Sequence, residues 1–136
     1  LLANPDGGAI VITSSAAGFK SVSTDFESMS HGAAGYTAAK HGVVGLTKSL
    51  AIELGPSAIR VLALAPTLVS TPGIAARQAE GGAAVGDLEA TVARDLPLGR
   101  IGVPDDIARV ALFAVSDMAS LMTGSTLIVD AGAMAS

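Results

Sequence analysis

Residues 36–54 read YTAAKHGVVGLTKSLAIEL, and this stretch decides how the chain folds. Its apolar residues recur every three or four positions, which predicts one α-helix over 35–54, and Gly55 and Pro56 are typical of a helix end. One stripe of this helix is apolar, and we expect it to face a β-sheet. That stripe consists of Ala39, Val43, Leu46, Leu50 and Leu54.

The opposite side of the predicted helix carries small residues where a solvated helix would carry charges. A glycine inside a helix costs about 1 kcal/mol relative to alanine, so this stripe calls for a packing reason. We predict the close approach of a second helix, which makes a homo-oligomer through the 35–54 helix the natural case; a tolerated weak surface is the alternative. The stripe consists of Ala38, Gly42, Gly45, Ser49 and Ile52.

Tyr36 and Lys40 lie four residues apart, so a helix places them side by side on one face. A neighbouring ammonium favours phenolate over phenol, which makes the phenol a usable proton donor and acceptor near neutral pH. Many helices carry such a pair as an ordinary surface feature. The pair indicates chemistry only together with other parts of the chain.

Three short runs rich in β-branched residues have the composition of strands buried on both faces. They are Ala9–Thr13, Ile59–Ala65 and Ser125–Val129. Helical patterns over 35–54 and 104–116 separate them, and this alternation predicts a parallel, right-handed α/β layer. The first run ends in Ser14 and Ser15, and ligands bind at the carboxyl ends of parallel strands.

The segment between the second strand and residue 98 contains two weak helical patterns, near 72–80 and 86–95. A helical excursion at the carboxyl end of a strand can act as a flap over a ligand. An ordinary surface excursion is nearly as well supported.

Composition excludes several classes of function. The 136 residues carry a net charge of −4 without a basic cluster, which argues against nucleic acid as the main partner. The longest apolar runs fall short of the ~18 residues that a membrane span needs. Without cysteine, and with two histidines that lack ligand spacing, the chain offers no disulfide and no metal site, and we expect a cytoplasmic protein.

Five segments in order resemble the carboxyl half of the short-chain dehydrogenase/reductase family. The resemblance implies an α/β fold with a three-layer parallel, Rossmann-like sheet, of which residues 1–136 supply the carboxyl-terminal half only. The segments are GGAIVITSSAAG at 7–18, YTAAKHGVVGLTKSLAIEL at 36–54, IRVLALAP at 59–66, LGRIGVPDDIA at 98–108 and LMTGSTLIVDAG at 121–132.

The resemblance implies an oxidoreductase that transfers a hydride between NAD or NADP and a small carbonyl compound or secondary alcohol. Tyr36 would exchange the hydroxyl proton, and Lys40 would support it and hydrogen-bond the nicotinamide ribose. Ser15 would hydrogen-bond the substrate oxygen, with Ser14 as the fallback for that role. The cofactor contacts that the resemblance implies are Tyr36, Lys40, Pro66, the backbone of Val69, and Thr71.

The chain departs from the family pattern at three places. Thr67 stands where glycine usually follows the proline and cannot take glycine's conformational range, which could displace that turn; we treat the departure as a variant and not as a loss. Leu62 replaces an asparagine in the second strand, and 20 residues separate Ser15 from Tyr36 where about a dozen are usual. In this longer stretch Phe19, Phe26 and Met29 would either shape an apolar substrate pocket or pack the loop onto the surface.

The glycine-rich turn of the family and its N-A-G segment do not occur in residues 1–136. We therefore expect these residues to be the carboxyl-terminal part of one dinucleotide-binding domain whose amino-terminal half lies upstream. A catalytically silent interaction module is the alternative from a different class. A sugar-nucleotide epimerase or dehydratase is a third reading, against which the short stretch after Asp130 speaks.

Overall fold

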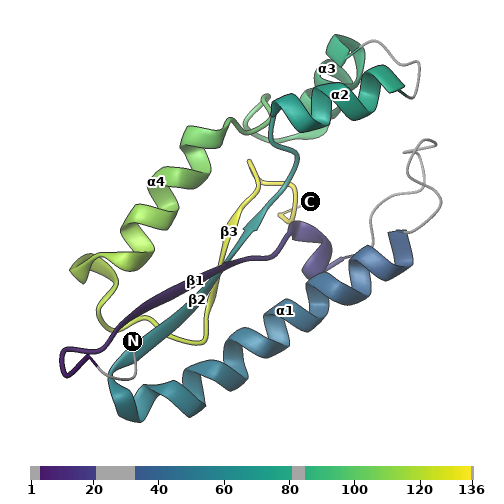
Figure 1. Ribbon diagram of the computed structural model, residues 1–136. Coiled ribbons are helices and arrows are strands. Elements are labelled where there is room, and N and C mark those ends of the chain that lie inside the picture. Colours follow the sequence, from purple (N-terminus) through teal and green to yellow (C-terminus); the bar gives the residue numbers. More distant parts are fainter. Residues whose placement is uncertain (1–3, 21–32, 81–84, 136) are drawn as a thin grey trace.

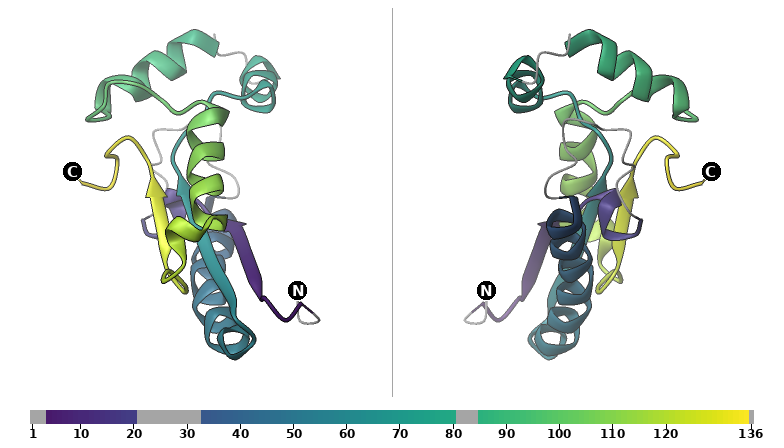
Figure 2. Two further views of the ribbon diagram at one scale, coloured as in Figure 1. Left: turned by 90° about the vertical axis from the view of Figure 1, so that its left-hand side faces the viewer. Right: turned by 90° about the vertical axis from the view of Figure 1, so that its right-hand side faces the viewer.

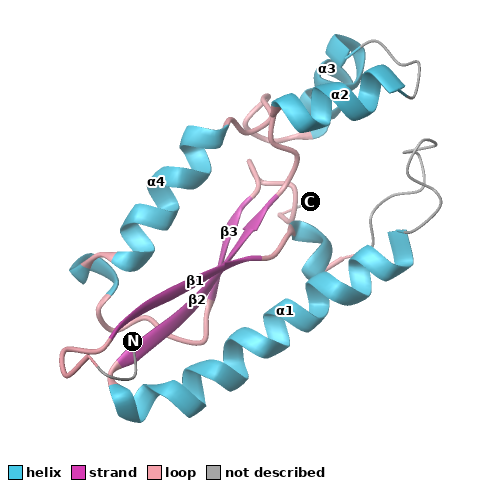
Figure 3. Cartoon of the chain, viewed as in Figure 1, coloured by secondary structure: helices cyan, strands magenta, loops and turns pink. Residues whose placement is uncertain are grey.

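A three-stranded parallel sheet lies between helices in the computed structural model, which describes residues 4–20, 33–80 and 85–135. The three layers of the α/β fold are visible in Figures 1 and 3. The strands are β1 (Gly8–Thr13), β2 (Ile59–Pro66) and β3 (Thr126–Val129), in the order β1-β2-β3. The predicted strands and their parallel arrangement are confirmed.

β2 is the centre of the sheet and of the hydrophobic core. Its residues from Val61 to Ala65 are all buried, as expected for a strand covered on both faces. It pairs with β1 from Gly8 opposite Ile59 onward, and with β3 up to Pro66 opposite Val129. Within the described residues β1 has a partner strand on one side only.

Helix α1 (Ala33–Leu54) covers one face of the sheet and α4 (Pro104–Val115) covers the other (Figure 2). On the α4 side Leu62 forms a core with Ala114 and Ala119, so the residue that replaces the family's asparagine serves as a buried apolar contact. The side chains that surround this core are Val11, Phe113, Met122 and Leu127.

The face that α1 turns to the sheet differs from the predicted one. Ala39 is exposed and Leu46 is 49% exposed, whereas Thr47 is fully buried together with Ala51. Val43, Leu50 and Leu54 are partly buried as predicted. The prediction was wrong for Ala39 and Leu46, and it missed Thr47 because it excluded a polar residue from the buried stripe. The hydroxyl of Thr47 donates to the Val43 carbonyl oxygen at 2.8 Å, which removes the cost of burying it.

The small-residue stripe of α1 lies directly opposite the buried face. A methyl group added at Gly42 or Gly45 would meet no atom within 4 Å, and Ile52 is 78% exposed. The described part of the chain therefore places nothing over this stripe, and no contact within it explains the glycines.

Beyond the carboxyl ends of the strands lie α2 (Pro72–Glu80) and α3 (Val85–Asp95), close to the predicted ranges (Figure 1). The Ser70 hydroxyl donates to Glu89 Oε1 at 2.7 Å, which ties α3 to the segment that follows β2. Among the described helices, none is long and apolar enough to cross a membrane.

Candidate active site

The site is built on the first two turns of α1, which begin beside the carboxyl ends of the strands (Figure 1). The Lys40 ammonium nitrogen lies 5.6 Å from the centre of the Tyr36 ring. Tyr36 is 44% exposed, so its hydroxyl-bearing ring is open to a ligand. One turn of helix thus brings an ammonium and a reachable phenol together, as the spacing of the two residues predicts.

Lys40 is held by the end of β1. Its Nζ donates to the Thr13 carbonyl oxygen at 3.1 Å. An ammonium has three N–H donors, so this contact fixes the side chain and leaves two donors for other partners. A strand-end carbonyl oxygen of this kind orients a flexible lysine without neutralising it.

Ser15 follows β1 in an extended conformation and caps the short 3-10 helix η1 (Ala16–Gly18). Its Oγ accepts a hydrogen bond from the Ala17 amide at 3.1 Å. A hydroxyl that accepts in this way keeps its own proton free to donate. The capping role and the proposed contact to a substrate oxygen are therefore compatible.

Ser14 is committed to the protein itself. Only 3% of the residue is exposed, and its Oγ donates to the Lys40 carbonyl oxygen at 3.0 Å. The geometry gives this hydroxyl a partner in α1 and so favours Ser15 over Ser14 as the group that meets a substrate.

Gly18 was not singled out from the sequence. A Cβ built on it would lie 2.9 Å from both the Lys40 carbonyl oxygen and the Ser14 Oγ, closer than real Cβ contacts come. Glycine at this place lets η1 pack directly against α1. The sequence contains no signal for this contact, because it involves backbone atoms 22 residues apart.

Thr67 takes part in the regular pairing of the strand end after Pro66. The Thr67 amide donates to the Val129 carbonyl oxygen at 3.3 Å and so continues the β2–β3 pairing. Thr67 is not among the described residues with a positive φ, which means that its backbone does not need glycine. The concern that this turn needs glycine's conformational range is therefore answered, and Thr67 fits the reading of a variant.

The backbone of Val69 forms a parallel bridge with Gly102. The two hydrogen bonds of this bridge run from Gly102 to the Leu68 carbonyl oxygen at 3.0 Å and from the Ser70 amide to Gly102 at 2.9 Å. Neither of these two hydrogen bonds uses the N–H or the C=O of Val69 itself. These two groups are left to face the other way, where a carboxamide could pair with them.

Thr71 stands at the start of α2. Its Oγ1 accepts from the Ile74 amide at 3.3 Å, and its carbonyl oxygen accepts from the Ala75 amide at 3.0 Å. It therefore acts as a helix N-cap, while its hydroxyl proton stays available. Pro66, Val69 and Thr71 follow one another from the end of β2 to the start of α2.

Of the three residues expected to shape an apolar pocket, Phe19 directly follows η1 and is 39% exposed. Phe26 and Met29 lie outside the described residues.

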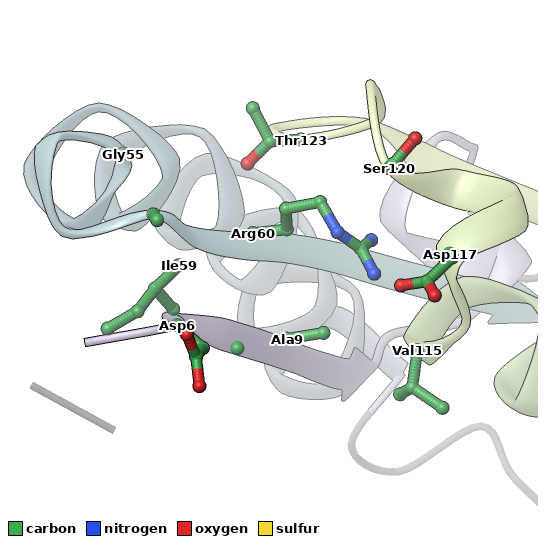
Figure 4. A pocket seen from close by; sticks show the side chains of 11 residues that line it. Asp6, Ala9, Gly55, Ile59, Arg60, Val115, Asp117, Ser120 and Thr123 are labelled. Atoms are coloured by element: carbon green, nitrogen blue, oxygen red, sulfur yellow. The ribbon is translucent and has the colours of Figure 1, made fainter. Parts of the chain in front are cut away.

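A hollow of about 420 Å³ lies at the end of the sheet opposite to Tyr36 and Lys40, around the amino ends of β1 and β2 (Figure 4). Arg60 borders it, and its guanidinium donates to the carbonyl oxygens of Ala114 and Ser116 at 2.8 and 3.1 Å. Arg60 thus secures the end of α4. The hollow is remote from the carboxyl edge, where Tyr36 and Lys40 lie, and we assign it no chemistry.

Comparison with known proteins shows which family and which relatives the chain is similar to. Residues 2–134 match the family model described as Enoyl-(Acyl carrier protein) reductase. Cyclohexanol dehydrogenase of an Acinetobacter species is 40% identical over 91% of this chain and 42% of its own length. (−)-trans-Carveol dehydrogenase of Rhodococcus erythropolis is 42% identical over 97% of this chain and 48% of its own length. The chain thus spans less than half the length of these curated relatives.

Solved structures agree with this fold. An oxidoreductase of the short-chain dehydrogenase/reductase family from Burkholderia thailandensis matches with a TM-score of 0.79 at 36% identity, over 95% of this chain and 46% of that one. Carveol dehydrogenase from Mycobacterium avium in complex with NAD matches with a TM-score of 0.81 at 34% identity, over 99% and 49%. ElxO with NADP bound matches with 0.77 at 26% identity, over 95% and 47%.

Proposed function

Because this chain belongs to the short-chain dehydrogenase/reductase family of oxidoreductases, we propose that it transfers a hydride between a nicotinamide cofactor and a small carbonyl compound or secondary alcohol. The observation that carries the proposal is the Tyr36–Lys40 pair, with Nζ 5.6 Å from an exposed phenol ring at the carboxyl edge of a parallel sheet. Such an edge is where α/β sheets bind ligands.

In the reducing direction, the Tyr36 hydroxyl donates its proton to the carbonyl oxygen as that oxygen gains charge. Ser15 donates a second hydrogen bond to the same oxygen, since its Oγ uses only acceptor capacity toward Ala17. Lys40 supplies the positive charge next to the phenol. In the oxidising direction the Tyr36 oxygen takes up the proton of the alcohol hydroxyl, while Ser15 keeps its own proton.

NAD or NADP is the cofactor that we propose, because the residues present fit a nicotinamide nucleotide. Lys40 keeps two N–H donors beyond its bond to Thr13, which suits the ribose hydroxyls. The N–H and C=O of Val69 complement a carboxamide, and the Thr71 hydroxyl lies two residues away. Pro66 directs the chain from β2 toward these groups. The bound nicotinamide supplies or accepts the hydride.

We further propose that residues 1–136 are the carboxyl-terminal part of a single dinucleotide-binding domain, with the glycine-rich phosphate-binding half upstream. The proposal rests on their match to less than half of each curated relative. The side of β1 that has no partner strand among the described residues gives such a half a strand with which to pair.

We also propose a homo-oligomer through α1. The small-residue stripe opposite the sheet is exposed, and a second helix could approach its backbone closely. Two copies of the stripe would bury Ile52, which is 78% exposed in the single chain.

The test of the proposed function is a panel of small ketones and secondary alcohols, assayed with NADH, NADPH and their oxidised forms on the full encoded polypeptide. We expect nicotinamide-dependent turnover of at least one carbonyl–alcohol pair. Cofactor binding without any turnover across the panel would favour the silent interaction module instead.

A further inference from the structure

Two neighbouring residues at the end of β1 hold Lys40 at both of its ends. The Ser14 Oγ donates to the Lys40 carbonyl oxygen at 3.0 Å, and the Lys40 Nζ donates to the Thr13 carbonyl oxygen at 3.1 Å. One bond fixes the backbone of the lysine, and the other fixes its ammonium. The two partners, Thr13 and Ser14, are consecutive residues at the end of β1. They therefore fix the position of Lys40 both at its backbone and at its ammonium group.

Ser14 is itself rigidly placed. Its amide donates to the Leu64 carbonyl oxygen at 2.7 Å, which ties it to the buried central strand β2. With 3% of the residue exposed, water does not compete for its hydroxyl. The hydrogen-bonded path therefore runs from the core of the sheet through Ser14 into the backbone of α1.

The bond from Ser14 is not needed to satisfy α1. A carbonyl oxygen inside a helix already accepts from the amide four residues further on, and it has a second lone pair for another donor. What the bond adds is a fixed position of Lys40 relative to β1.

Gly18 keeps this contact tight. A Cβ at residue 18 would come within 2.9 Å of both the Lys40 carbonyl oxygen and the Ser14 Oγ. Gly18 in η1 therefore packs directly against the hydrogen bond between Ser14 and Lys40. Any residue with a side chain at position 18 would push one of these two groups aside.

We propose that Ser14 is a positioning residue, which docks the Lys40 backbone onto the end of β1 and thereby sets where the ammonium meets Tyr36 and the cofactor. This inference rests on the proposed function. It gives the first serine of the pair a role distinct from that of Ser15, since Ser14 acts through Lys40 and touches no reacting atom.

The primary experiment compares Ser14→Ala with Thr47→Val in the full encoded polypeptide. Both remove a buried hydroxyl that donates to a carbonyl oxygen of α1, but the Thr47 bond stays within the helix. We expect Ser14→Ala to lower kcat about 10- to 100-fold, the cost of a small misplacement of a catalytic group. Its dissociation constant for the cofactor, measured by direct titration without substrate, should rise several-fold. Thr47→Val should change neither quantity.

A double-mutant cycle with Lys40→Met separates positioning from general stability. If Ser14 acts through the ammonium, Ser14→Ala should cost little further activity or cofactor affinity once that ammonium is gone. A purely structural role predicts the same fractional loss in both backgrounds.

Gly18→Ala probes the same contact without removing the hydroxyl, and it serves as the test if Ser14→Ala fails to fold. We expect the same pattern of lowered kcat and weakened cofactor binding.

Unchanged kinetics and cofactor binding in folded Ser14→Ala, or in Gly18→Ala if only that variant folds, would overturn the inference. A parent enzyme that turns over its substrate and a Tyr36→Phe variant that does not would leave the proposed function standing in that case. A parent without nicotinamide-dependent turnover would remove both.

Discussion

Lys40 lies one helical turn from Tyr36, with its Nζ 5.6 Å from the centre of the tyrosine ring. The same Nζ donates a hydrogen bond to the Thr13 carbonyl oxygen at the end of β1. The pair is therefore part of the fold and not a chance meeting of two surface side chains. Everything that we propose for the chemistry depends on this placement.

Lys40→Arg should not preserve activity, although it keeps the charge. A planar guanidinium cannot take the place of a compact ammonium that serves Thr13 and a ligand at once. We expect kcat to fall by about tenfold or more, the scale of a misplaced catalytic group. Steady-state kinetics beside Lys40→Met checks this. Parent-like kinetics in Lys40→Arg would show that the position needs charge alone.

Thr71→Ala should loosen the start of α2. The threonine Oγ1 accepts from the Ile74 amide, and the loss of such a cap costs about 1 kcal/mol. Amide hydrogen exchange in the first turn of α2 should become several-fold faster, whereas Thr71→Ser should exchange as the parent does. Equal exchange in the alanine and serine variants would contradict the capping role.

The stability contributed by Asp106 should depend on pH. Two hydrogen bonds from the Arg100 guanidinium, at 2.7 and 2.9 Å, and a third from the Val103 amide hold the pKa of Asp106 well below its usual range. The contribution is present above the ordinary pKa of this carboxyl group and is lost as the pH falls toward the lowered value. The denaturation midpoint of Asp106→Asn should therefore lie below that of the parent at pH 7.

The same comparison at about pH 3 should give a smaller difference between Asp106→Asn and the parent, because Asp106 of the unfolded parent, whose pKa is not lowered, then binds a proton and stabilises the unfolded state. The pair is exposed to solvent, so high salt should also reduce the difference at pH 7. A difference that stays constant down to pH 3 would contradict the assignment.

Gly45→Arg should reduce the oligomer mass if two copies meet through α1. A Cβ added at this exposed glycine would meet no atom of the described residues within 4 Å, so we expect the arginine to disturb a partner and not the described fold. Gly73→Arg, at an exposed helical glycine of α2, makes the same change away from the stripe. Light scattering should give a lower mass for Gly45→Arg alone. An unchanged mass in both variants would remove α1 from the interface.

Local sequence signals predicted the helices and strands and the side-by-side placement of Tyr36 and Lys40. β-Branched runs gave the strands, and Pro104 with two following acids marked the start of α4. The four-residue spacing of Tyr36 and Lys40 is itself the geometry, because one helix carries both. These features depend only on residues close together in the chain.

What the sequence could not predict involves backbone atoms or distant partners. The face of α1 was misplaced because the burial of Thr47 depends on its bond to a carbonyl oxygen. The contact of Ser14 with the Lys40 carbonyl oxygen, and the glycine at 18 beside it, link segments that no periodicity connects. The bridge between Val69 and Gly102 is of the same kind.

The central claim is hydride transfer with Tyr36 as the proton donor, and isotope transfer tests it most directly. The full encoded polypeptide is given a ketone substrate from the panel and NADH or NADPH carrying deuterium at C4, one face at a time. The account predicts an alcohol with one deuterium at its carbinol carbon from one labelled face only. Tyr36→Phe should still bind cofactor, as direct titration measures, but form the labelled alcohol about 10²- to 10⁴-fold more slowly. An alcohol without deuterium from either face, or parent-like rates in Tyr36→Phe, would contradict the account.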